Sequence, residues 1–137
     1  MGTTIYGRCL CGNVAYEYTG TLGPAHYCHC EDCRRRTGSA FNIAVRCDPA
    51  KFRILSGTPK GYTKRADSGN ELTRYFCPEC GSPIYTASPK HPEHVYLKAG
   101  TLNDPRVVKP AHQNWLASAV PWSKIDDGLP GYARGPI

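Results

Sequence analysis

The sequence predicts a single, mainly β domain with short helical turns, held together by metal as well as by its core. Its 137 residues suit one domain. Glycine and proline number 14 and 12, which favours short strands and many turns over a helical bundle. Only 40% of the residues are hydrophobic, and this figure counts eight Cys and nine Tyr. Because large aliphatic side chains are scarce, the clustered cysteines are the expected second source of stability.

The expected elements are short and lie between turn signals. A helix of one or two turns is predicted over residues 31–36, with Gly38 ending it. Residues 72–76 and 83–86 flank a cysteine pair and are expected to form a hairpin. Prolines recur along the last 30 or so residues, which are therefore expected to be mostly loop. Further strands are expected over residues 14–18, 25–27, 39–46, 51–55 and 94–98.

The N-terminus shows no basic segment followed by an apolar stretch, so we expect no secretory signal. No apolar run exceeds three residues, which excludes a membrane helix and predicts no membrane partner. We therefore expect a cytoplasmic protein. In a reducing compartment, clustered cysteines are expected to bind metal rather than to form disulfides.

The basic charge of the chain is modest once metal binding is considered. The formal net charge is +6 with Cys counted as neutral. Seven thiolates bring seven negative charges and two Zn²⁺ ions bring four positive ones, so the net charge becomes +3. The dense basic cluster is confined to residues 34–36. A nucleic-acid interface normally shows a basic stripe, so the composition disfavours a nucleic-acid partner.

Two cysteine pairs have the form of zinc knuckles. Residues 9–12 read C-x-C-G and residues 77–81 read C-P-x-C-G. The glycine that follows each pair permits the positive φ of a tight turn, in which backbone N–H groups can point at sulfur. Two such pairs make a closed, structural Cys₄ zinc site. Its predicted ligands are Cys9, Cys11, Cys77 and Cys80.

The middle cysteines differ, because C-x-C-x-x-C at residues 28–33 places three thiols in one short segment. With no fourth cysteine to close the site, Cys28, Cys30 and Cys33 are predicted to bind a catalytic zinc with one open position. An alternative ribbon-like site would join Cys30 and Cys33 to the pair at residues 77–80. It would need a loop of 43 residues and would leave three of the cysteines unused. The remaining Cys47 is expected to be a small buried hydrophobe.

Several of these segments resemble the signature of the glutathione-dependent formaldehyde-activating enzyme (GFA) family. The resemblance covers residues 5–125, and its motifs lie at residues 7–12, 28–41, 76–81 and 99–105, with His112 and Trp122. It implies one GFA-like domain over residues 1–137 with the Mss4-like fold. It also implies one structural and one catalytic zinc on the two cysteine sets described above.

Two residues are candidates for work on the substrate. If residues 30–37 are helical, Arg34 shares a face with Cys30 and Cys33, so it is expected to hold a substrate carboxylate. The alternative is a solvated surface arginine, and Arg36 is expected to matter much less. His112 matches a family position and is a candidate proton shuttle. A histidine packed beside tryptophan is the alternative there.

The predicted function is that of a zinc-dependent carbon–sulfur lyase or synthase. It would act on the adduct of a small thiol and an aldehyde, as the resemblance to S-(hydroxymethyl)glutathione synthase implies. The alternative is a zinc-binding interaction module that docks nucleic acid or protein without catalysis. A third reading is a redox or zinc-storage protein. The sequence leaves open the thiol, the aldehyde, the direction of reaction and the oligomeric state.

Overall fold

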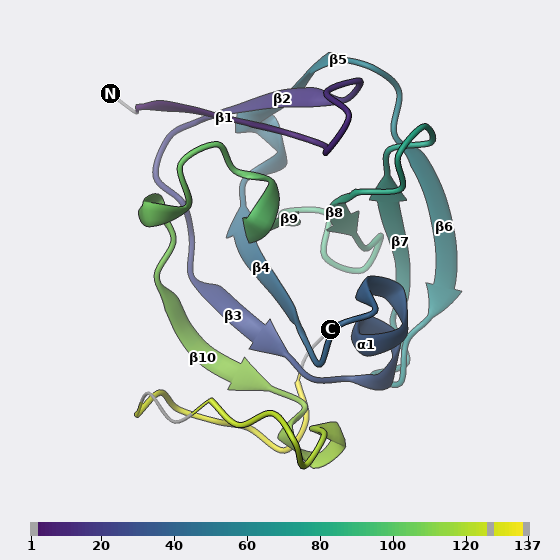
Figure 1. Ribbon diagram of the computed structural model, residues 1–137, viewed down its shortest axis with the longest axis vertical. Coiled ribbons are helices and arrows are strands. Elements are labelled where there is room, and N and C mark those ends of the chain that lie inside the picture. Colours follow the sequence, from purple (N-terminus) through teal and green to yellow (C-terminus); the bar gives the residue numbers. More distant parts are fainter. Residues whose placement is uncertain (1–2, 126–127, 136–137) are drawn as a thin grey trace.

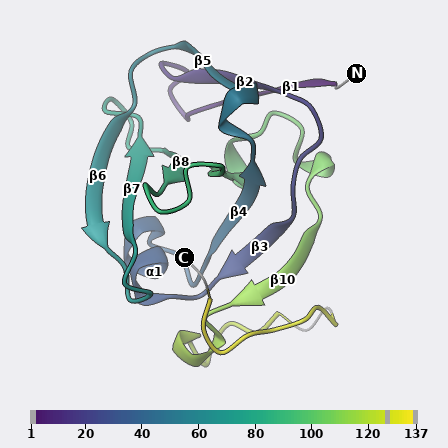
Figure 2. The same ribbon diagram turned by 180° about the vertical axis from the view of Figure 1, so that it is seen from behind.

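The computed structural model describes residues 3–125 and 128–135, which form two β-sheets and one α-helix. The strands run in the order β1-β2-β5 in a small sheet and β10-β3-β4-β9-β8-β7-β6 in a large one. Figure 1 shows the small sheet at one end of the molecule, with the large sheet curving away from it towards α1. The view from behind in Figure 2 shows the same arrangement. The expected mainly β fold is confirmed.

The strands are short, as the turn-rich sequence predicted. The small sheet contains β1 (Thr4–Arg8), β2 (Ala15–Thr19) and β5 (Phe52–Ser56). One half of the large sheet contains β10 (Pro110–Asn114), β3 (Ala25–Cys28), β4 (Asn42–Cys47) and β9 (Val95–Lys98). The other half contains β8 (Pro83–Ala87), β7 (Glu71–Phe76) and β6 (Lys60–Arg65). Short 3₁₀ turns span Pro49–Lys51, Ala99–Thr101, Pro105–Val107 and Leu116–Ser118.

The pairing is antiparallel throughout the named strands, except that β10 lies parallel to β3. The expected hairpin is confirmed as β7 and β8. The sequence did not predict β1, β6 or β10, and β4 begins at Asn42 rather than at residue 39. The prolines that recur along the last 30 or so residues had predicted a loop where β10 forms. Pro110 is tolerated because it opens an edge strand, where no partner needs its missing N–H.

The main core lies between the two sheets. Its most buried side chains include those of Tyr16, Val45, Ile84 and Leu97, each at most 1% exposed. Cys47 packs in this core, and burial raises the pKa of its thiol to about 12. The prediction that Cys47 is a buried hydrophobe is therefore confirmed.

Helix α1 (Glu31–Thr37) begins where the sequence predicted and ends one residue later than predicted. Cys30 is its N-cap, and the Cys30 thiol accepts a hydrogen bond from the Cys33 N–H. Gly38 follows with φ +70° and donates its N–H to the Arg34 carbonyl, 2.9 Å away. Across the described ranges, no helix combines the length and the apolar character that crossing a membrane requires.

Candidate metal centres

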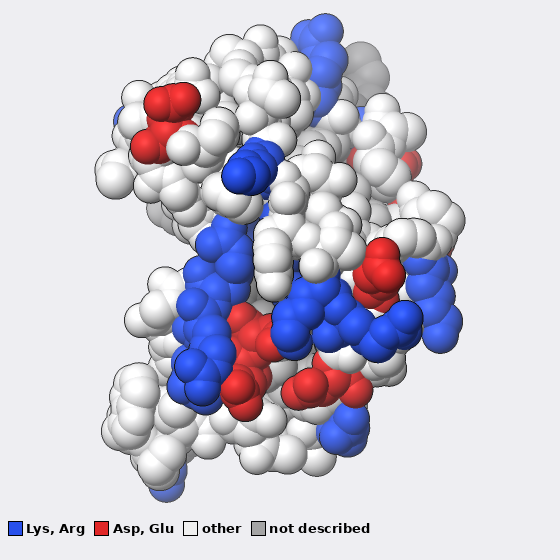
Figure 3. All heavy atoms as spheres, turned by 90° about the vertical axis from the view of Figure 1, so that its right-hand side faces the viewer, with Lys and Arg blue, Asp and Glu red and all other residues white. Residues whose placement is uncertain are grey.

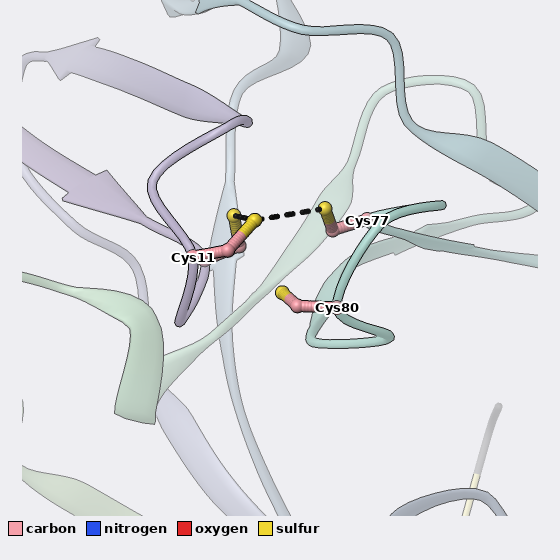
Figure 4. A group of neighbouring side chains, drawn as sticks. Cys11, Cys77 and Cys80 are labelled. Carbon is pink, nitrogen blue, oxygen red and sulfur yellow. Dashed lines mark hydrogen bonds between the residues drawn. The ribbon is translucent and has the colours of Figure 1, made fainter.

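The four knuckle thiols converge between the two sheets. The sulfur atoms of Cys9, Cys11, Cys77 and Cys80 all lie within 4.8 Å of one another. Figure 4 shows the labelled Cys11, Cys77 and Cys80 pointing toward a common centre. The Cys9–Cys11 and Cys11–Cys77 sulfur distances are 3.6 and 3.8 Å. A tetrahedral zinc with bonds of about 2.3 Å holds its sulfur ligands about 3.8 Å apart, so these residues fit that ion.

Each knuckle has the local geometry that its Cys-Gly ending predicted. Gly12 and Gly81 have φ values of +84° and +81°. The Val14 N–H donates to the Cys9 sulfur at 3.3 Å. The Ser82 hydroxyl lies 3.3 Å from the Cys80 sulfur and lowers the pKa of that thiol. The Leu10 N–H donates to the Ser82 hydroxyl at 3.0 Å, which joins the turn after β1 to the turn between β7 and β8.

The middle thiols meet where β3 gives way to α1. Cys28 is the last residue of β3, Cys30 caps the helix, and Cys33 lies in its first turn. Their sulfur atoms lie within 4.8 Å of one another. Hydrogen bonds from the thiols of Cys28 and Cys33 hold the pKa of Cys30 far below its usual range, and the same bonding raises that of Cys28. Three convergent thiols, one of which ionises readily, suit a zinc ion.

No fourth Cys, His, Asp or Glu of the described residues joins this trio. The ribbon-like alternative, in which Cys30 and Cys33 would join Cys77 and Cys80, is therefore wrong. His29 lies between two of the thiols but turns away from them. Its Nε2 atom is 2.9 Å from the Gln113 side-chain oxygen in β10.

All three middle thiols line a small cavity of about 30 Å³, which has room for about two water molecules. Its walls come from the ends of β3 and α1 and from side chains of the strands that face them. The Trp115 indole, 3% exposed, packs directly against the thiols. The other lining residues include His26, Asp32, Asn42, Leu72, Arg74, Thr86, Tyr96 and Lys98.

Two cations line this cavity, and the sequence singled out neither of them. Lys98 of β9 points away from the core side of its strand, and burial lowers the pKa of its ammonium to about 8. Arg74 of β7, whose side chain is 8% exposed, lies 3.8 Å from the Asp32 carboxylate. The signal for Arg74 was a charged residue at an inward position of an alternating strand, two residues after the buried Leu72.

The two predicted substrate residues lie outside the cavity lining. His112 stacks on the cavity residue His26, with 5.3 Å between ring centroids. Burial lowers the pKa of His26 to about 4, so it is neutral near pH 7. Arg34 is on α1 but does not line the cavity, whereas Arg36 lies over the Phe76 ring and lines a neighbouring groove. The roles of Arg34 and His112 stay predictions.

A model of the glutathione-dependent formaldehyde-activating enzyme family matches residues 4–118. The chain belongs to this family. The match takes in both cysteine sets and every strand of the two sheets. The expectation that came from the sequence motifs is confirmed at the level of the family.

Individual relatives agree with this assignment. A putative glutathione-dependent formaldehyde-activating enzyme of Halomonas elongata is 24% identical over 88% of this chain and 80% of its own length. A Podospora anserina protein with the same description is 30% identical over 62% of this chain, which spans only 40% of that relative. A crystal structure of a Rhodobacter sphaeroides protein matches 93% of this chain and 99% of its own, with 22% identity and a TM-score of 0.61. That likeness supports the fold.

Residues 128–135, which follow the part of the chain matched by the family model, contact residues of the cavity wall. The Tyr132 N–H donates to the Gln113 carbonyl at 2.9 Å, which places residues 128–135 beside β10. Arg134 then lies 4.4 Å from the centre of the Trp115 ring and donates to the Asp67 carbonyl at 3.4 Å. Because Trp115 and Asp67 both line the cavity, Arg134 links two of its walls.

Proposed function

We propose that the protein joins a small thiol to formaldehyde, and splits the adduct in reverse, as a carbon–sulfur lyase with zinc at both cysteine centres. Glutathione is the proposed thiol, because the family is described as glutathione-dependent. One observation carries the proposal. Three thiols with no fourth ligand among the described residues line a confined cavity that also holds two cations.

The catalytic zinc would supply the positive charge that keeps a substrate thiol in its nucleophilic, thiolate form. The cavity residues then have separate tasks. When the substrate sulfur attacks the aldehyde carbon, a carbon–sulfur bond forms and the carbonyl π electrons move to oxygen. The Lys98 ammonium, which lines the cavity, would stabilise that developing negative charge by a hydrogen bond. The proton lost by the thiol ends on the new hydroxyl group, so no redox partner is needed.

The size of the cavity suits a one-carbon aldehyde. A volume of about 30 Å³ favours a small aldehyde over one with a long side chain. Trp115 and Tyr96, 3% and 9% exposed, form apolar walls that limit the water beside the reacting atoms. The remainder of the thiol substrate must therefore lie outside the cavity.

The test is the rate of exchange between ¹³C-formaldehyde, glutathione and their adduct, measured by NMR with the zinc-loaded protein. We expect the protein to accelerate exchange above the uncatalysed rate, and Cys30→Ser to abolish the acceleration while keeping its fold. Cys47→Ser removes a thiol that belongs to neither cysteine centre and should retain the acceleration. Exchange at the uncatalysed rate with fully zinc-loaded protein would contradict the proposal and favour an interaction module.

A further inference from the structure

A second, more open groove of about 250 Å³ lies next to the thiol cavity. It is lined by side chains of α1, β6 and β7, namely Asp32, Arg35, Arg36, Tyr62, Lys64 and Arg74. The cavity and the groove share Asp32 and Arg74, so they are immediate neighbours separated by one ion pair. Figure 3 views this side of the molecule, where Lys and Arg side chains surround a few acidic ones.

The groove has more positive than negative charge. Four of its six lining residues are cationic, and Asp32 is the one carboxylate among them. That carboxylate is already engaged, because it accepts hydrogen bonds from Lys64 at 2.9 and 3.0 Å and also faces Arg74. Arg35 pairs with Glu31 outside the groove, but both side chains are more than half exposed, so the pair is weak.

Among the described residues, Arg36 is the cation of this groove that has no carboxylate partner. Its guanidinium lies 4.9 Å from the centre of the Phe76 ring. Its Nη2 atom is buried and has no hydrogen-bond partner within the described ranges, and no carboxylate of those ranges forms an ion pair with it. Burial, together with the nearby Arg74, lowers the pKa of Arg36. Two neighbouring guanidinium groups, of which only that of Arg74 faces a carboxylate, favour an anionic ligand.

We propose that this groove binds a carboxylate of the substrate whose sulfur occupies the thiol cavity, which makes the substrate an acidic thiol. The inference rests on the proposed function and adds the part of the site that selects the thiol. Glutathione has one carboxylate beside an ammonium group and another, on its glycine, without one. A groove with excess positive charge repels the ammonium, so the glycine carboxylate is the one that binds there.

The test compares glutathione with its glycine carboxamide, by calorimetric titration of the zinc-loaded protein. We expect wild type to bind glutathione about 10- to 100-fold more tightly than the amide, as one charge-assisted contact would give. Arg36→Gln should bind the two thiols with equal, weaker affinity, and Arg36→Lys should restore part of the difference. Arg53→Gln removes the same charge from an exposed site on β5 and should behave as wild type.

Equal affinities of wild type for glutathione and the amide would overturn the inference. So would an Arg53→Gln loss as large as that of Arg36→Gln, because net charge alone would then explain it. Should Arg36→Gln fail to fold, Lys64→Gln at a more exposed position of the groove repeats the test.

S-methylglutathione and its amide separate this inference from the proposed function, because neither has a free thiol. If wild type prefers S-methylglutathione over its amide and Arg36→Gln does not, the groove assignment stands even where formaldehyde exchange is not accelerated. If exchange is accelerated equally with glutathione and its amide, the proposed function stands and the groove assignment fails.

Discussion

The guanidinium of Arg134 lies 4.4 Å from the centre of the Trp115 ring, and the middle thiols pack against that indole. A cation over an indole contributes about 0.5–2 kcal/mol, more when the pair is shielded from water. We therefore expect the confinement of the cavity to depend on a segment that lies outside residues 4–118, the part of the chain that the family model matches.

Arg134→Ala should leave the fold intact and loosen Trp115. In a Trp122→Phe background, which removes the exposed second tryptophan, acrylamide should quench the remaining fluorescence more strongly after the change. Arg106→Ala, at an exposed ion pair near β10, is the control and should not alter quenching. Unchanged quenching in Arg134→Ala would mean that the arginine does not hold the indole in place.

Cys77→Ser should unfold the domain or leave it insoluble. Its sulfur is fully buried within the Cys₄ cluster that joins the two sheets, and the binding energy of a structural zinc is folding energy, about 10–16 kcal/mol for zinc-finger peptides. Far-UV circular dichroism and zinc content measure the outcome. A folded Cys77→Ser protein that lacks this zinc would contradict the structural role.

The two centres should lose zinc at different rates. The middle trio supplies three protein ligands beside a cavity, whereas the knuckles supply four. Mild chelation should therefore take the zinc content from about two ions per chain to about one, while circular dichroism stays unchanged. The remaining ion should be lost only together with the fold. Simultaneous release of both ions at unchanged structure would oppose this assignment.

Alkaline pH should weaken the contribution of Cys47 to stability. Burial raises the pKa of its thiol from 9.0 to about 12. Between these two pH values the thiol stays protonated in the folded state but has lost its proton in the unfolded state. The stabilising effect is complete below pH 9 and falls by about 1.4 kcal/mol per pH unit as the pH rises towards 12. Urea unfolding of wild type and Cys47→Ala should show their difference shrinking between pH 9 and 11. A constant difference over that range would contradict the burial effect.

The local parts of both metal centres could be predicted from the sequence, because close ligands and their turn glycines are encoded within a few residues. Gly12 and Gly81, with their positive φ values, belong to such short-range patterns. The cations beside the middle thiols could not be predicted in this way. Lys98 and Arg74 reach the cavity only through the pairing of β9 with β4 and of β7 with β8.

Helical periodicity alone also favoured Arg34 over Arg36 for the substrate. A helical wheel gives the angle between side chains but not the identity of the neighbouring strand. Here β6 and β7 stand beside α1 and make Arg36, rather than Arg34, a wall of the groove. That information depends on contacts between residues about 40 positions apart, which no short motif contains.

The pairing of residues 128–135 with β10 has a further consequence, for the solubility of the protein. An uncovered edge strand offers unpaired backbone groups to another chain and promotes aggregation. The hydrogen bonds of Gln113 with Pro130 and Tyr132 occupy this edge of the large sheet. The opposite edge, β6, is exposed at every residue but carries Lys60 and Lys64, whose charges oppose edge-to-edge association. A chain shortened at residue 127 would leave β10 open, and sheets of neighbouring molecules could then join there.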